Sequence, residues 1–172
     1  MLKNNIVING GRELASPASM RIPGDISSAA FFLVLGSISP GADIRIKNVC
    51  LNPTRIGIIQ VLQRMGADFK IIPQKAGCQG GEPAGDIHVK NKELKGTVIS
   101  GKTIPSLIDE LPVLMVAACF ARGKSEFAGI QELRVKETDR IRSMVENLKK
   151  MGADISVCRQ KGVEKVVICG GK

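Results

Sequence analysis

Apolar positions along the chain follow two helical patterns that alternate. Residues 27–35 begin with two serines and are then apolar on all sides, which predicts a buried helix with a serine N-cap that stops before Pro40. Residues 58–65 carry apolar side chains on one face only, which predicts an amphipathic helix with Asn52 as N-cap and Pro53 at its first position. The pair recurs as a buried helix over about 109–121 and an amphipathic helix over about 141–151.

The two amphipathic helices end in nearly the same sequence. Residues 64–68 read Arg-Met-Gly-Ala-Asp and residues 150–154 read Lys-Met-Gly-Ala-Asp, 86 residues apart, and an apolar strand follows each. Further strands are expected near 43–47, 86–90, 97–99, 125–128 and 163–169. We therefore predict an α/β (α+β) fold of two repeated βαβαββ units, about 22–91 and 96–171, with helices packed inside and against mixed sheets. Residues 1–21 form a lead-in segment with short extended pieces at 6–8 and 20–22.

The composition is ordinary for a globular protein, with 172 residues of which 44% are apolar and 24% charged. No apolar run approaches the roughly 20 residues of a membrane span, and the first residues lack a signal-peptide core, so we expect a cytoplasmic protein. The five cysteines are odd in number and form no C-x-x-C pair, which argues against a disulfide framework and a zinc site. We expect them to be small buried residues.

The net charge of +9 is compatible with nucleic acid, an anionic membrane surface or small polyanionic substrates. Modules that stack nucleic-acid bases need exposed aromatic side chains. The chain has no Trp, no Tyr and five Phe, and three of these, Phe31, Phe32 and Phe120, lie inside apolar runs. Small anions are therefore the favoured partners, and neither nucleic acid nor a membrane is expected.

Two candidate motifs carry little weight. Residues 96–103 match the phosphate-binding pattern G-x-x-x-x-G-K-[ST], but polar residues precede them and Pro105 interrupts the helix that should follow, so we expect no nucleotide site. The single histidine, His88, lies in a predicted strand, where a surface or edge-strand position is the default. With one histidine, catalytic metal chemistry is not expected.

The charged run at residues 134–140 is the strongest chemical candidate. It places Lys136 and Arg140 on one face of a predicted helix start, next to Glu137, where the helix dipole adds positive potential. The run can hold an anion, or it can be a solvated helix start with internal ion pairs. Asp109, at the start of an apolar helix, is a second candidate, as an N-terminal cap, a carboxylate with a tuned pKa, or both.

Four segments together resemble one enzyme family, the EPSP synthases (3-phosphoshikimate 1-carboxyvinyltransferases). They are P-G-D-I-S-S-A-A-F-F at 23–32, N-P-T-R at 52–55, I-D-E-L-P at 108–112 and E-L-R-V-K-E-T-D-R at 132–140. The resemblance spans nearly the whole chain. It implies transfer of the enolpyruvyl group from phosphoenolpyruvate to the 5-hydroxyl of shikimate 3-phosphate, with release of phosphate, in aromatic amino-acid biosynthesis. It implies neither a metal nor an organic cofactor.

The resemblance also implies roles for single residues. Asp109 would contact the substrate 5-hydroxyl and accept its proton, and Glu137 would protonate the enol methylene. Lys136 would bind the 3-phosphate, and Arg140 would bind phosphoenolpyruvate. An Asn can stand in related sequences where Glu132 stands here, so Glu132 is given no role.

Members of this family have two domains of three such units each, with the active site in the cleft between them. The resemblance thus implies a fragment, with residues 1–21 from the end of the N-terminal domain and residues 22–172 from most of the C-terminal domain. We expect this chain to fold without turnover, and the full-length form to be a monomer. Two alternatives remain open: a fragment of the sister UDP-N-acetylglucosamine enolpyruvyltransferase, and a non-catalytic RNA-binding α/β module.

Overall fold

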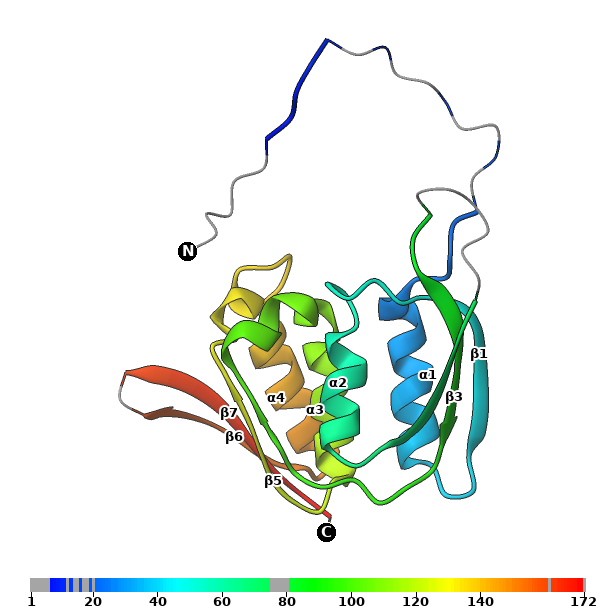
Figure 1. The fold of residues 1–172 in the computed structure, drawn as a ribbon. Helices are drawn as coiled ribbons and strands as arrows, with labels where there is room; N and C mark the ends of the chain where they lie inside the picture. Colours follow the sequence, from blue (N-terminus) through cyan, green and yellow to red (C-terminus); the bar gives the residue numbers. More distant parts are fainter. Residues whose placement is uncertain are drawn as a thin grey trace.

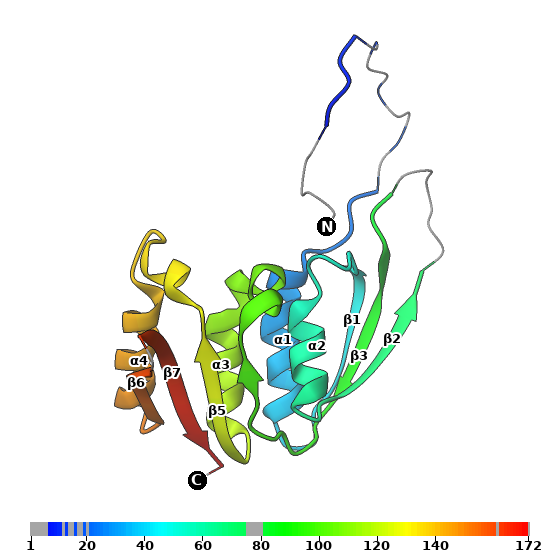
Figure 2. The same ribbon diagram turned by 60° about the vertical axis from the view of Figure 1, so that its left-hand side comes forward.

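Four α-helices run side by side between two β-sheets (Figure 1). The computed structural model describes residues 7–11, 13, 16, 19, 21–74, 81–160 and 162–171. Turning the molecule by 60° shows that the three-stranded sheet and the four-stranded sheet lie on opposite sides of the helices (Figure 2). The two buried helices, one from each predicted unit, contact each other at the centre.

The first unit builds the three-stranded sheet, in the order β1-β3-β2 with antiparallel neighbours. Its elements are α1 (Ile26–Ile38), β1 (Asp43–Cys50), α2 (Gly57–Arg64), β2 (Asp68–Pro73) and β3 (Ala84–Lys90). The second unit builds the four-stranded sheet, in the order β4-β5-β7-β6. Its elements are β4 (Val98–Ile99), α3 (Leu111–Phe120), β5 (Gly123–Ala128), α4 (Arg140–Lys150), β6 (Asp154–Gln160) and β7 (Val163–Gly170), with 3₁₀ turns η1 (Gly101–Ser106), η2 (Ile108–Glu110) and η3 (Gln131–Arg134).

The predicted repeat extends to the hydrogen bonds that end α2 and α4. Gly66 and Gly152 both have positive φ, 93° and 89°, which favours glycine at these positions. The amide of the alanine after each glycine donates to a carbonyl five residues back, Ala67 to Leu62 and Ala153 to Leu148, at 2.9 Å in both cases. The second unit has the full predicted order βαβαββ, which confirms the α/β class.

The first unit lacks a regular leading strand. Gly24 forms only an isolated parallel bridge to Val49, at the place where β4 pairs in parallel with β5 in the second unit. Val7, Ile8, Arg21 and Ile22 have no regular structure, so the extended pieces expected there are not strands; Ile6 and Met20 lie outside the described residues.

Two helix starts differ from the sequence prediction. Helix α1 is capped by Asp25, whose carboxylate accepts from the amides of Ser27 and Ser28, so the N-cap is not a serine. Helix α2 begins at Gly57 rather than Pro53, because the Asn52 side chain accepts hydrogen bonds from the amide and hydroxyl of Thr54 and closes a turn.

Helix α1 is not buried all round as predicted. Its apolar residues Leu33 and Val34 are fully buried, whereas Phe31 and Phe32 are 65% and 55% exposed. Phe120 at the end of α3 is also exposed. The cysteines are less buried than expected: Cys50, Cys119 and Cys169 are half-buried and Cys158 is exposed, while Cys78 lies outside the described residues. The apolar run of α1 did not indicate that one face of the helix would be exposed to solvent.

The two units meet closely at Gly57. A Cβ atom there would lie 2.8 Å from the Ser106 carbonyl oxygen and 3.0 Å from the Leu107 Cβ of the second unit. We expect Gly57→Ala to lower the free energy of unfolding by about 1–3 kcal/mol, because this backbone contact cannot yield without moving one unit. Urea unfolding measures the change. Gly10→Ala, which has open space around it, is the control, and an equal effect of both variants would contradict the close contact.

Candidate functional site at the helix N-termini

The four helices begin at the same edge of the molecule, the upper edge in Figure 1. Amide groups at helix N-termini lack intrahelical partners, and the helix dipoles point their positive ends there. Aspartates cap two of the helices: Asp25 caps α1, and Asp139 caps α4 by accepting from the Arg142 amide at 3.0 Å. This edge therefore favours anions.

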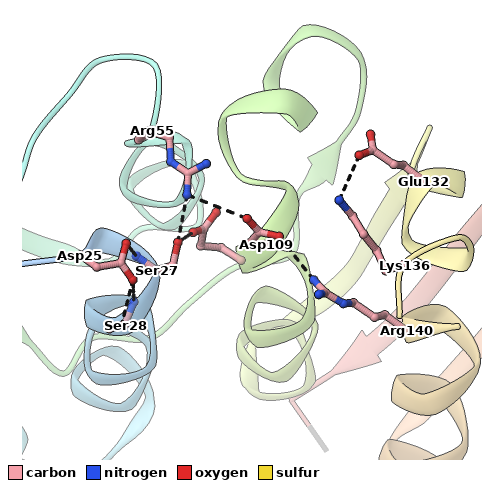
Figure 3. A network of polar contacts seen from close by, with 9 residues as sticks. Asp25, Ser27, Ser28, Arg55, Asp109, Glu132, Lys136 and Arg140 are labelled. Atoms are coloured by element: carbon pink, nitrogen blue, oxygen red, sulfur yellow. Dashed lines mark hydrogen bonds and ion pairs between the residues drawn. The ribbon is translucent and has the colours of Figure 1, made fainter. Parts of the chain in front are cut away.

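Asp109 lies at the centre of this edge, on the turn η2 that leads into α3 (Figure 3). An arginine from each unit reaches it: Arg140 Nη1 lies 3.4 Å from one carboxylate oxygen and Arg55 Nη2 lies 3.9 Å from the other. The Asp109 side chain is 42% exposed, so a ligand can reach it. Because α3 has no side-chain cap, Asp109 does not serve as the N-terminal cap that the sequence suggested.

Arg140 also pairs with Glu137, at 2.9 Å from Nη2 to Oε2. The backbone amide of Glu137 itself and the guanidinium of Arg140 hold the pKa of the Glu137 carboxyl below its ordinary value. Glu137 is therefore ionised at neutral pH in this state. One arginine thus joins two carboxylates, Asp109 and Glu137.

The charged run is not helical as predicted. Helix α4 begins only at Arg140, and Lys136 and Glu137 lie in the irregular segment between η3 and α4. Lys136 and Arg140 therefore do not share a helix face. Lys136 instead pairs with Glu132 of η3, at 3.1 Å, and approaches the same edge from the irregular segment (Figure 3). The structure thus brings Arg140 into contact with both Asp109 and Glu137, with Lys136 in a neighbouring ion pair.

Sequence reasoning missed three residues of this network: Ser27, Arg55 and Glu110. The Ser27 hydroxyl donates to the Glu110 carboxylate, which is buried, and accepts from Arg55 Nη2 at 3.2 Å. The available signals were the segments at 23–32 and 52–55, which carry Ser27 and Arg55, and the second carboxylate beside Asp109. None of these signals predicts that the segments at 23–32 and 52–55 contact each other or Glu110.

Arg134 holds the irregular segment in place. Its guanidinium bonds both Glu164 oxygens, at 2.8 and 2.9 Å, and Asp139 at 2.6 Å. The pKa of Glu164 is lowered chiefly by Arg134. The pKa of Asp139 is lowered first by the Arg142 amide and then by Arg134. Strand β7 is thereby tied to the start of α4.

We expect Arg134→Met to lower the free energy of unfolding by about 1 kcal/mol at pH 7. A carboxyl whose pKa is lowered by folding stabilises the fold above its ordinary value, 4.5 for Glu164, and loses that contribution as the pH falls through its folded-state pKa. The difference in the free energy of unfolding between the parent and Arg134→Met should therefore become smaller as the pH falls below 4.5. Urea unfolding against pH measures it. Arg122→Met, which breaks an exposed pair with Glu93, is the control; a pH-independent loss in Arg134→Met would contradict the assignment.

The weaker sequence motifs do not form sites at this edge. The phosphate-binding pattern leads into the short 3₁₀ turn η1 rather than an α-helix, and its Lys102 is exposed. His88 lies on β3, which is the central strand of its sheet and not an edge strand, and pairs with Asp43 of the neighbouring strand β1. Within the described ranges, no three His, Cys, Asp or Glu side chains cluster as metal ligands. None of the helices that the structure describes has the length and apolar character to cross a bilayer.

Solved structures with this arrangement define the class of protein. The enolpyruvyl transferase NikO from Streptomyces tendae matches with a TM-score of 0.51 over 85% of this chain and 30% of its own, at 15% identity, a likeness of fold alone. An EPSP synthase from Acinetobacter baumannii matches with a TM-score of 0.79 and 44% identity, over 89% of this chain and 34% of its own. The chain has the fold of the enolpyruvyl transferases.

The sequence comparisons identify the family. The family model described as EPSP synthase (3-phosphoshikimate 1-carboxyvinyltransferase) matches residues 2–169. The 3-phosphoshikimate 1-carboxyvinyltransferase of Acaryochloris marina is 48% identical over 152 residues, 88% of this chain and 33% of the relative. The 3-phosphoshikimate 1-carboxyvinyltransferase of Gloeothece citriformis is 54% identical over 135 residues, which are 78% of this chain and 30% of the relative. The chain belongs to the EPSP synthase family and spans about a third of the length of these relatives.

Proposed function

We propose that this chain carries part of the site at which enolpyruvyl is transferred from phosphoenolpyruvate to the 5-hydroxyl of shikimate 3-phosphate, in the cytoplasm. The contact of Arg140 with both Asp109 and Glu137, at a helix edge that favours anions, is the observation that carries the proposal. Asp109 and Glu137 would be the catalytic residues. Asp109, Lys136 and Arg140 would bind the substrates, and no cofactor is needed.

The chemistry matches the residue types. The hydroxyl oxygen adds to the substituted carbon of the enol, Asp109 takes the hydroxyl proton, and Glu137 gives a proton to the methylene carbon, which becomes a methyl group. Loss of phosphate and return of that proton restore the double bond on the new ether. Lys136 and Arg140 neutralise the phosphate and carboxylate charges of the two substrates.

The pairing of Arg140 with Glu137 has a consequence for this sequence of steps. An acid must carry a proton, yet Arg140 favours the ionised form of Glu137. An anionic substrate that engages Arg140 draws it away from Glu137, which raises the proton affinity of the carboxyl. Binding of phosphoenolpyruvate would thus prepare the acid that acts on it.

The proposal treats residues 22–172 as most of a C-terminal domain that needs the rest of a longer chain. The exposed Phe31, Phe32 and Leu35 side chains on α1 support this, because a helix that is apolar on all sides is normally covered on all sides. We expect the 172-residue chain to release no phosphate from the two substrates on its own. Turnover by this chain alone would contradict that expectation.

A fusion enzyme tests the function. The corresponding third of the Acinetobacter baumannii EPSP synthase is replaced by this chain, and phosphate release is measured with both substrates. The proposal predicts turnover by the fusion that requires shikimate 3-phosphate. A well-folded fusion that is inactive with shikimate 3-phosphate, or that instead uses UDP-N-acetylglucosamine, would reject it.

A further inference from the structure

Two arginines of different origin hold the Asp109 carboxylate. Arg140 belongs to the second unit, like Asp109 itself, and approaches Oδ1, whereas Arg55 comes from the turn before α2 in the first unit and approaches Oδ2. The carboxylate is therefore held from both sides of the boundary between the units (Figure 3). Arg140 is within hydrogen-bond range of Oδ1, at 3.4 Å, whereas Arg55 lies 3.9 Å from Oδ2 and acts as a nearby positive charge. Positive charges beside both oxygens favour one direction of the carboxylate over others.

The two arginines differ in their other contacts. Arg140 is shared with Glu137 and is the residue proposed to bind an anionic substrate, so its bond to Asp109 weakens when the substrate arrives. Arg55 also donates to the Ser27 hydroxyl, at 3.2 Å, and lies close enough to Asp25 to add to the capping hydrogen bonds that lower the pKa of that carboxyl. Arg55 therefore stays available to Asp109 when Arg140 turns to the substrate.

Ser27 connects this contact to the buried neighbour of Asp109. Its hydroxyl accepts from Arg55 and donates to Glu110, which is only 2% exposed and lies beside Asp109 on η2. A single hydroxyl in the first turn of α1 thus binds both Glu110 and Arg55. This arrangement fixes η2, and with it the Asp109 backbone, relative to the first unit.

We propose that Arg55 is a positioning residue for Asp109, which it keeps directed at the substrate hydroxyl once Arg140 is engaged by an anion, with Ser27 holding Arg55 in place. The inference rests on the proposed function. It assigns a role in the reaction to the first unit. Among the described contacts, the N-P-T-R segment of that unit reaches the Asp109 carboxylate through Arg55. Loss of Arg55 should act through Asp109 and leave the fold intact.

The test compares Arg55→Gln and Arg55→Lys with Arg64→Gln, which removes an exposed arginine from the last turn of α2, the helix that follows the turn carrying Arg55. Carboxyl-carbon and guanidinium NMR signals of Asp109 and Arg140 are recorded in the 172-residue chain, with thermal unfolding as the check on folding. The proposal predicts that Arg55→Gln moves both signals, that Arg55→Lys moves them less because the charge is retained, and that Arg64→Gln moves neither. Unchanged Asp109 and Arg140 signals in Arg55→Gln, or equal changes in Arg64→Gln, would overturn it.

Titration with shikimate 3-phosphate, with and without phosphoenolpyruvate, separates this inference from the proposed function. Arg55→Gln should weaken binding by up to about fivefold, more strongly when phosphoenolpyruvate occupies Arg140, while Arg64→Gln binds as the parent does. If the parent binds neither ligand but Arg55→Gln still moves the Asp109 signal, the positioning contact stands and the proposed function fails. If the parent binds and Arg55→Gln binds equally well in both titrations, the positioning role fails and the function stands.

Discussion

Asp109→Asn in the fusion enzyme is expected to lower the rate of phosphate release by about 10²–10⁴-fold, the range by which a positioned base accelerates proton transfer. An amide has nearly the shape of the carboxylate but cannot accept the hydroxyl proton at neutral pH. The side chain is 42% exposed, and its ion-pair partners among the described residues are Arg55 and Arg140, so the fold should survive the change. The steady-state rate and the Michaelis constants for both substrates measure the effect.

The matched control is Asp68→Asn, which removes an exposed carboxylate at the start of β2, just after the C-terminal end of α2. It should leave the rate unchanged. A similar loss in both variants would indicate a general effect of charge, and an active Asp109→Asn enzyme would remove Asp109 from the reaction.

Phe127→Ala is expected to have the largest effect on stability, a loss of about 3–5 kcal/mol in the free energy of unfolding. Phe127 lies in β5, has no exposed surface and is among the largest fully buried side chains. Phe127 is paired with Val166 of β7 and Ile99 of β4, which are also buried, so its removal leaves a cavity in the core on that face of the sheet. Urea unfolding of the 172-residue chain gives the difference.

Phe31→Ala provides the control, because it removes the same side chain from a position that is 65% exposed. Its effect should stay within about 0.5 kcal/mol. A loss from Phe31→Ala as large as that from Phe127→Ala would mean that the open face of α1 is covered in solution, for instance by a second copy of the chain.

The elements of the fold could be predicted because the local patterns are strong and occur twice. The Met-Gly-Ala-Asp ending at 65–68 and 151–154 marks the helix ends correctly, since a glycine with positive φ is needed there in both units. The helix starts were harder. The Asn52 and Asp139 side chains accept hydrogen bonds from backbone amides two and three residues further on, which favours a turn at Asn52 and a late helix start at Arg140. Helix propensity alone does not reveal these bonds.

The sequence named candidate residues for the site but not the contacts among them. The spacing in the run placed Glu137 near Arg140, but it did not predict that Arg140 also reaches Asp109. The joint contact of Ser27 with Arg55 and Glu110 depends on α1 lying beside η2 and on the turn before α2. The exposed Phe31, Phe32 and Phe120 show the same difficulty, since an apolar run does not state which faces are covered. Their exposure also weakens the aromatic argument against nucleic acid.

An amide NMR titration of the 172-residue chain with shikimate 3-phosphate, with UDP-N-acetylglucosamine as the control ligand, tests the central claim most directly. The account predicts shifts concentrated at Asp109 and at residues 136–140 with the first ligand only, because these residues carry the charges of the proposed site. Shifts with UDP-N-acetylglucosamine instead, or shifts from shikimate 3-phosphate confined to other parts of the chain, would contradict it.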